Sequence, residues 1–64
     1  MTLKALIVDD ESLGRRGLKL RLADIEGIEV VGECSNGIEA IAAIPELNPD
    51  LVFLRFVVLR FVVL

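Results

Sequence analysis

The sequence predicts an α/β fold, one half of a doubly wound parallel sheet, on three observations. Apolar runs at residues 3–8, 28–34 and from 51 onwards have the length and β-branched content of strands. The two segments between them carry apolar residues at helical spacing. The connections are short, so the order β-α-β-α-β requires parallel strands joined by right-handed crossovers. We therefore expect the strand order 2-1-3, with one helix on each face of the sheet.

The first strand and the first helix meet at a run of acidic residues. Residues 3–8 read Leu-Lys-Ala-Leu-Ile-Val and end in Asp9, Asp10 and Glu11, as a strand buried on both faces does when it reaches a polar edge. The helix is expected from Glu11 to about Asp24, with Asp10 or Ser12 as its cap. Gly27 is placed to end it, because glycine adopts a positive φ without a Cβ penalty.

The second strand and helix follow directly. Ile28–Cys34 is rich in β-branched residues and alternates in part, as an exposed or edge strand does. Asn36 and Glu39 match a capping box in which each residue satisfies a backbone donor near the other. Pro45 lacks the N–H that would bond to the fourth residue before it, so the regular helix should stop or kink near Ile44.

The third strand opens at Leu51 and runs into a repetitive tail. Residues 54–58 read Leu-Arg-Phe-Val-Val, and residues 59–63 repeat them. No Gly, Pro, Asn or Asp lies in the tail to form a tight hairpin, so we expect an extended third strand. The chain then divides into a half-domain at 1–54 and an apolar extension at 55–64. An unbroken strand of this length exceeds what so small a domain can pair internally, so part of it must project, bend or pair with another chain.

Charge and hydrophobicity are distributed unevenly, and this excludes several classes of function. Residues 1–50 have a net charge of −5, whereas the tail from residue 51 has 12 apolar residues in 14 positions and a charge of +2. The chain lacks the basic surface and the stacking aromatics of a nucleic-acid-binding protein. A single Cys and no His exclude an intramolecular disulfide and a structural zinc site, which fits a reducing cytoplasm. The tail is shorter than a membrane span and contains two Arg, so we expect no membrane partner.

Three segments in this order resemble the first half of a bacterial response-regulator receiver domain. They are residues 6–12 (LIVDDES), 30–40 (VVGECSNGIEA) and 49–54 (PDLVFL), and the match covers residues 3–54. Residues 13–18 (LGRRGL) are similar to receivers that precede LytTR-type DNA-binding domains. The resemblance implies a flavodoxin-like fold, a cytoplasmic location and a role in a two-component phosphorelay.

The resemblance also implies a site, which this chain only partly has. In the family, an acidic pair at the end of the first strand binds Mg²⁺, and an Asp at the end of the third strand accepts a phosphoryl group. Asp9 and Asp10 match the acidic pair, as a vestigial and weak metal site. Arg55 stands at the acceptor position, and a guanidinium has no nucleophilic oxygen. The fourth and fifth strands, where the family has a hydroxyl residue and a Lys, are missing, so we expect no phosphoacceptor activity and no cofactor beyond weak Mg²⁺.

Two interpretations of Arg55 stay open at this stage. In one, its guanidinium takes the place of Mg²⁺ and pairs with Asp9 or Asp10. In the other, it is a solvated residue on an exposed strand. Similarly, the basic residues of the first helix are either a solvated face paired with nearby acids or a partner site, and Cys34 is more simply a small buried residue than a reactive thiol.

The leading functional interpretation is a truncated or engineered receiver-like fragment, not an enzyme, that forms a homodimer through its third strand. Two tails lying antiparallel would give the strand order 2-1-3-3′-1′-2′, and exchange of the tails between protomers is a variant. One alternative is a phosphorelay receiver fragment that binds Mg²⁺, and another is an aggregation-prone product without defined function. The residues expected to mediate self-association are Phe53, Arg55, Phe56, Val57, Val58, Leu59, Arg60, Phe61, Val62 and Val63.

Overall fold

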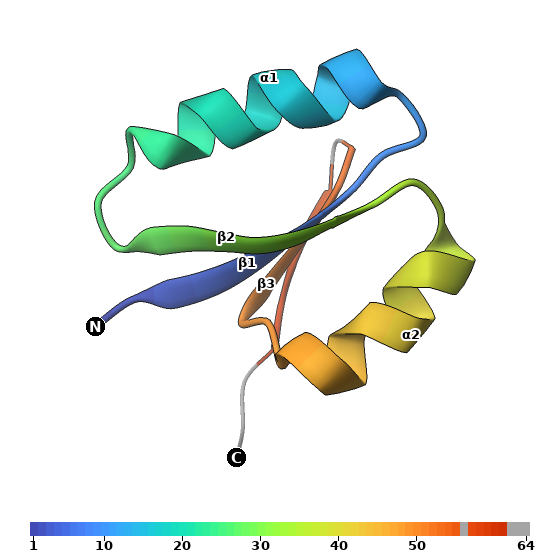
Figure 1. The fold of residues 1–64 in the computed structure, drawn as a ribbon. Helices are drawn as coiled ribbons and strands as arrows, with labels where there is room; N and C mark the ends of the chain where they lie inside the picture. The colour runs from blue at the N-terminus through green and yellow to red at the C-terminus, as the bar shows by residue number, and fades with distance from the viewer. Residues whose placement is uncertain (56, 62–64) are drawn as a thin grey trace.

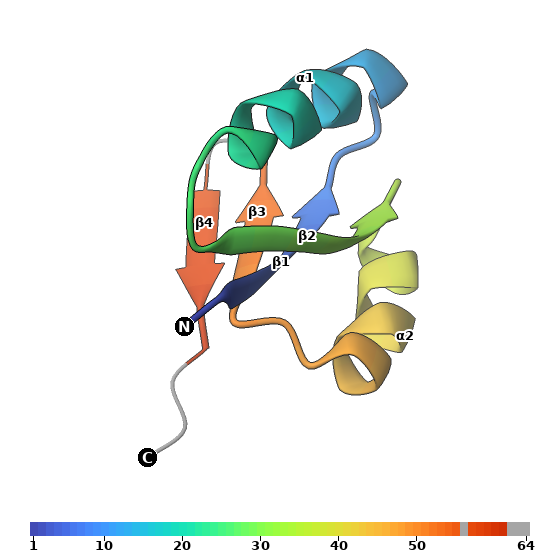
Figure 2. The same ribbon diagram turned by 60° about the vertical axis from the view of Figure 1, so that its left-hand side comes forward.

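Two helices and a four-stranded sheet make up the chain, and the computed structural model describes residues 1–55 and 57–61. The elements are β1 (Leu3–Val8), α1 (Ser12–Ala23), β2 (Ile28–Cys34), α2 (Gly37–Leu47), β3 (Leu51–Leu54) and β4 (Val57–Arg60). The strand β1 pairs in parallel with both β2 and β3 (Figure 1), and the order of the four strands is β2-β1-β3-β4 (Figure 2). The predicted α/β class and the order 2-1-3 are therefore confirmed.

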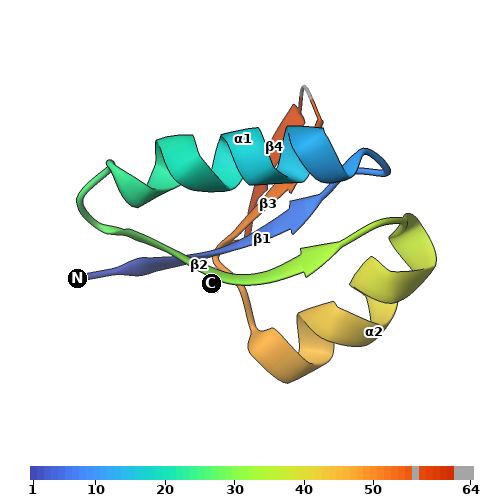
Figure 3. The same cartoon turned by 45° about the horizontal axis from the view of Figure 1, so that its top comes forward.

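The helices cover opposite faces of the sheet, as expected for a doubly wound fold (Figure 3). Both α1 and α2 contact β1 and β2, and among the described residues neither helix makes a comparable contact with β3 or β4. We call the two surfaces of the sheet the α1 face and the α2 face. One side of the sheet is thus sandwiched between helices, while the β3–β4 side is open.

The core lies on β1, the strand with a neighbour on each side and a helix on each face. Its last four residues, 5–8, are buried, and Leu6 and Ile7 are fully so. Side chains alternate across a strand, so Leu6 and Val8 point to the α2 face, where they pack with Cys34, Ala40 and Val52. Each fully buried aliphatic side chain contributes about 1.5–3 kcal/mol to folding, so this short strand supplies a large share of the stability.

The second helix begins as predicted and ends later than predicted. The backbone N–H of Glu39 donates to Asn36 Oδ1 at 2.9 Å, so the predicted Asn36 cap is confirmed. The Glu39 carboxylate reaches back one residue further than predicted, and it accepts from the Ser35 N–H at 3.0 Å. The predicted stop near Ile44 is wrong, because α2 continues through Pro45 to Leu47. The last turn is held by Asn48, whose left-handed backbone lets its N–H donate to the Ile44 carbonyl.

The ends of the first helix also differ in detail from the prediction. Glu11 is the N-cap residue, without a capping side-chain hydrogen bond, in place of the expected Asp10 or Ser12. At the other end the helix closes at Asp24, which keeps a right-handed backbone. Gly27 does have a positive φ of 91°, but it lies in the turn that leads into β2 rather than at the helix terminus.

The extended third strand is the main correction that the structure makes. The chain turns back after Leu54, and β4 pairs antiparallel with β3 (Figure 2). The register places Leu54 opposite Val57, so two residues connect the strands. Val62 and Val63, which the prediction also assigned to the extension, lie outside the described residues.

Arg55 makes this turn without glycine. Its φ is 55°, in the left-handed region that tight two-residue hairpins require at their first position. That conformation costs a residue with a Cβ about 1–2 kcal/mol. The cost is offset because folding back pairs the backbone groups on the outer edge of β3, which an extended strand would leave without protein partners. The hairpin forms although the turn residues do not favour it.

No helix in residues 1–55 and 57–61 is long and apolar enough to cross a membrane.

Candidate functional site

Charged residues gather at the carboxyl ends of β1 and β3, which meet because the two strands are parallel neighbours. Asp9 directly follows β1, Glu11 precedes α1, and Arg55 directly follows β3. Arg55 Nη2 donates to Glu11 Oε1 at 2.9 Å, and Arg55 Nε lies 4.0 Å from Asp9 Oδ1. A guanidinium therefore sits beside the acidic run, where the sequence resemblance implies a metal ion.

Asp9 is the most enclosed carboxylate of this group, with 15% of its side chain exposed. Its Oδ1 accepts a hydrogen bond from the Glu11 N–H at 2.9 Å. This bond is the main reason that the pKa of Asp9 is lowered, and the positive charges of Arg55 and Arg15 lower it further, against the opposing effect of partial burial. The structure thus favours an ionised Asp9.

Gly14 makes room for this carboxylate. A Cβ at residue 14 would lie 2.9 Å from Asp9 Oδ2, so a larger residue would displace the side chain. Asp9 and Arg55 also border a hollow under α1, whose other lining residues are Leu13, Gly14, Gly17, Leu18 and Arg21. Gly14 is therefore the residue that lets α1 lie close to the Asp9 carboxylate.

The sequence interpretation of Arg55 placed it near Asp9 or Asp10, and the structure brings it to Asp9 and Glu11. Asp10 is exposed. Glu11, the stronger partner by distance, was not among the predicted site residues. One sequence signal could have indicated it, because Glu11 directly follows the acidic pair at the start of a helix that packs beside β1.

The described residues do not fit a Mg²⁺ ion. A hard divalent cation needs several oxygen ligands, and no group of three or more potential ligand residues comes together in residues 1–55 and 57–61. The carboxylates of Asp9 and Glu11 already face the Arg55 guanidinium. A positive charge 4.0 Å from Asp9 would repel a second cation.

Basic residues of α1 belong to an ion-pair network with β2. Lys19 Nζ lies 3.1 Å from Glu33 Oε2, and Arg15 Nε lies 3.6 Å from Glu33 Oε1. Arg15 also donates through Nη1 to the carbonyl of Asp9. For Lys19 and Arg15 the structure therefore supports the interpretation as a helix face paired with nearby acids. Their contacts connect α1 to β2 and to the residues around Asp9.

Cys34 is buried, with 4% of its surface exposed. Burial raises the pKa of its thiol, and the charge of Glu39 raises it further. A raised pKa disfavours the reactive thiolate, so Cys34 is a core residue, as predicted.

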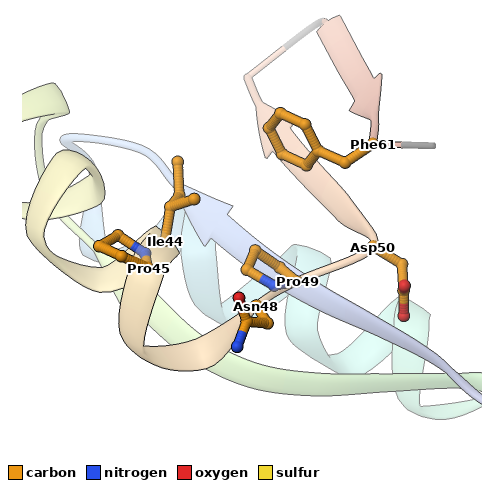
Figure 4. Close-up of a pocket in the computed structure, with 6 residues that line it drawn as sticks. All are labelled: Ile44, Pro45, Asn48, Pro49, Asp50 and Phe61. Carbon is orange, nitrogen blue, oxygen red and sulfur yellow. The ribbon is translucent and has the colours of Figure 1, made fainter. Parts of the chain in front are cut away.

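A second hollow lies at the end of α2 (Figure 4). Ile44 and Pro45 come from the helix, Asn48, Pro49 and Asp50 from the connection, and Phe61 from beyond β4. Phe61 is held there by its N–H, which donates to the Asp50 carbonyl at 2.9 Å. Asp50 in turn exchanges backbone and side-chain hydrogen bonds with Lys4, so the end of the tail is tied to β1.

The residues predicted to mediate self-association are mostly exposed where the structure describes them. Val57 and Val58 are 53% and 54% exposed, and Leu59, Arg60 and Phe61 are exposed as well. Phe53 is half-buried in β3. Phe56, Val62 and Val63 lie outside the described residues.

Comparison with known proteins places most of the chain beside response regulators. No family model matches. Over 52 residues, 81% of this chain, the sequence is 52% identical to the transcriptional regulatory protein BtsR of Escherichia coli strain K12 and 56% identical to an uncharacterized response regulatory protein of Yersinia pestis. It is 44% identical over the same length to the response regulator GacA of Pseudomonas syringae pv. syringae.

These relatives are much longer than the chain. The aligned segment covers 22% of BtsR and of the Yersinia protein, and 24% of GacA. The chain thus spans about a fifth to a quarter of the length of the relatives it matches. The fold and the similarity together support a fragment of a response-regulator receiver domain, which is the class that the sequence resemblance indicates.

Proposed function

We propose that this chain is a receiver-like fragment that has lost phosphoacceptor activity and that associates with itself through its C-terminal strand. The first part of the proposal rests on one observation, the guanidinium of Arg55 beside Asp9 and Glu11 at the end of β3. In receivers this is the place of the acceptor Asp. An Arg stays protonated and has no oxygen with which to attack phosphorus.

The ion pairs of Arg55 support the same conclusion for metal binding. Mg²⁺ assists phosphoryl transfer by neutralising charge between carboxylates and phosphate. Here the neutralising charge is supplied by the protein itself. The Asp9 and Glu11 carboxylates are therefore engaged, and we expect Mg²⁺ to bind only weakly.

Acetyl phosphate labelling and Mg²⁺ titration test this part of the proposal. We expect no mass increase in the native chain incubated with acetyl phosphate and Mg²⁺. Calorimetric titration should give at least about tenfold tighter Mg²⁺ binding in Arg55→Asp, because the change removes a cation and adds a carboxylate ligand. Arg60→Asp, which makes the same charge change on exposed β4, should bind Mg²⁺ as the native chain does.

A phosphorylated native chain would instead support a working phosphorelay fragment. Submillimolar Mg²⁺ binding by the native chain, unchanged by Arg55→Asp, would likewise contradict a site occupied by Arg55. Equal gains in Arg55→Asp and Arg60→Asp would show a general effect of net charge rather than a local one.

The proposed partner is a second copy of the chain. Among the described residues β4 approaches neither helix, and its apolar side chains are about half exposed. An uncovered edge strand has unpaired backbone groups that attract another strand. Since β4 already occupies the outer edge of β3, we place the interface on β4, in place of the direct pairing of third strands in the original hypothesis.

Sedimentation equilibrium over micromolar to millimolar concentrations tests self-association. We expect a reversible monomer–dimer equilibrium. A monomer throughout the range would refute self-association, and fibres that bind thioflavin would support the aggregation-prone alternative.

The origin of the fragment is part of the same proposal. We infer a parent response regulator of the LytTR type from residues 13–18, and a tail altered after residue 54 because the five-residue repeat starts there. A tandem repeat in the coding DNA would support duplication or engineering of the tail. An unrelated codon pattern in the two copies would count against duplication.

A further inference from the structure

We infer that β4 pairs antiparallel with β4 of a second copy around a two-fold axis at Leu59. This inference rests on the proposed self-association and specifies the surface and the register. It follows from the backbone groups that β4 leaves unpaired, from the position of its charge, and from the absence of a covering helix in the described part of the chain.

The direction of the backbone groups along β4 follows from the hairpin register. In an antiparallel pair, residues alternate between those that exchange hydrogen bonds with the partner and those that point away from it. The Phe61 N–H donates to the Asp50 carbonyl, so residues 61, 59 and 57 bond to β3. The N–H and C=O groups of Val58 and Arg60 therefore point outward, to the free edge of the sheet.

In a two-fold dimer, Val58 and Arg60 of each chain offer outward backbone groups, and only one register pairs all four residues. With Leu59 opposite its own copy, Val58 of each chain lies opposite Arg60 of the other, and the two pairs exchange four backbone hydrogen bonds. Centring the axis on Val58 would place Arg60 opposite the hairpin connection. Centring it on Arg60 would put two positive charges directly opposite each other, which is destabilising.

The side chains suit the same register. The hairpin pairs Leu59 with Val52, whose side chain packs in the core on the α2 face, so Leu59 lies on that face with Val57 and Phe61. In the dimer Leu59 meets Leu59, and Val57 meets Phe61 of the partner subunit, which lengthens one apolar stripe. Arg60 lies on the opposite face, beside Val58 rather than within the stripe.

The geometry of the edge allows this approach. In the described part of the chain the helix backbones lie over β1 and β2 and away from β4, so no helix stands between two copies at this edge (Figure 2). The paired segments are short, and an interface this small is typical of weak, reversible association. The predicted assembly is an eight-stranded sheet in the order 2-1-3-4-4′-3′-1′-2′.

Disulfide trapping tests the register. In the proposed dimer the two residues 59 form a non-hydrogen-bonded pair with Cα atoms about 4.5 Å apart, within the range for a disulfide. Under mild oxidation at a concentration where the chain is dimeric, Leu59→Cys should form a covalent dimer quickly. Val57→Cys, on the same strand and face, should cross-link at least tenfold more slowly, because its partner is Phe61. Native Cys34 is buried and common to both variants.

Proline at an outward position tests the hydrogen bonds. Val58→Pro removes an N–H that the hairpin does not use, and edge strands tolerate proline at such positions. We expect a folded monomer by sedimentation and circular dichroism, whereas Val58→Thr, which keeps the N–H, should remain a dimer. If Val58→Pro does not fold, the cysteine pair alone decides.

The outcomes separate the two levels of the proposal. Equal cross-linking of Leu59→Cys and Val57→Cys, or a dimeric Val58→Pro, overturns the β4 register and leaves self-association standing. A native chain that is monomeric at every concentration overturns both. Rapid Leu59→Cys trapping together with a monomeric Val58→Pro supports both.

Discussion

Arg55 combines two roles that usually fall to different residues. Its backbone supplies the left-handed conformation of the hairpin, and its side chain reaches Glu11 and Asp9. The first role is unfavourable for any residue with a Cβ, whereas exposed ion pairs contribute about 0–1 kcal/mol each. The free-energy cost of the Arg55 backbone conformation and the gain from its ion pairs are thus similar in size. The hydrogen bonds between β3 and β4 therefore determine whether the hairpin is stable.

Two substitutions that both remove the guanidinium isolate the backbone cost. Arg55→Gly and Arg55→Ala lose the same ion pairs, but only glycine adopts a positive φ freely. We expect urea denaturation to show Arg55→Gly more stable than Arg55→Ala by about 1 kcal/mol. Equal stability of the two variants would mean that the turn does not hold residue 55 in the left-handed region.

Glu39 links the start of α2 to the acid stability of the fold. Hydrogen bonds from the hydroxyl and the backbone N–H of Ser35 lower the pKa of Glu39 below its ordinary value of 4.5. The ionised form therefore stabilises the folded chain. This contribution is fully present above pH 4.5 and is lost as the pH falls through the lower pKa of the folded state.

Glu39→Gln should remove this pH dependence. We expect the variant to be less stable than the native chain at pH 7 and to lose less stability between pH 5 and about 3. Urea midpoints at several pH values measure the difference. Glu46→Gln, which removes an exposed carboxylate from the last turn of the same helix, serves as the control for the loss of one negative charge. Parallel curves for Glu39→Gln and the native chain would contradict the assigned role.

At the scale of elements, local signals predicted starts better than ends. The Asn36 cap, the strands and the helix segments follow from side-chain chemistry and periodicity that are visible in the sequence. The continuation of α2 past Pro45 depends on packing: Leu47 lies over β2, where a Cβ at Gly32 would meet it at 2.8 Å. The hairpin depends on the open edge of β3, which exists only once the sheet has formed.

Pro45 should therefore weaken the helix that contains it. It is exposed, so its removal costs little packing, while alanine restores the hydrogen bond to the Ile41 carbonyl. We expect Pro45→Ala to raise the free energy of unfolding by about 2 kcal/mol after the gain in unfolded-state entropy is allowed for. Glu46→Ala should change it by less than about 0.5 kcal/mol. A destabilised Pro45→Ala would show that the proline ring contributes to the hollow beside Phe61.

At the scale of the whole molecule, the helices protect only half of the sheet. The sequence predicts the class, the parallel order and the opposite placement of the helices, because these follow from connection lengths and handedness. It also places Asp9 and Arg55 near each other through the neighbouring strand ends. It does not predict the β4 edge, because this edge depends on a turn that no residue type in the tail favours. The choice of Glu11 over Asp10 as the partner of Arg55 depends on how the chain passes from β1 into α1, which the sequence pattern does not specify.

The two-residue connection between β3 and β4 also determines which assembly is compatible with the fold. Across this hairpin, Leu54 and Val57 share a face, whereas in an uninterrupted strand residues three apart point to opposite faces. Straightening the chain, as tail exchange between protomers requires, would turn Leu59 and Phe61 away from the α2 face and bring Arg60 onto it. Exchange would thus move each side chain of the tail to the opposite face of the sheet. Edge-to-edge pairing of β4 leaves every side chain on the face that it occupies in the monomer.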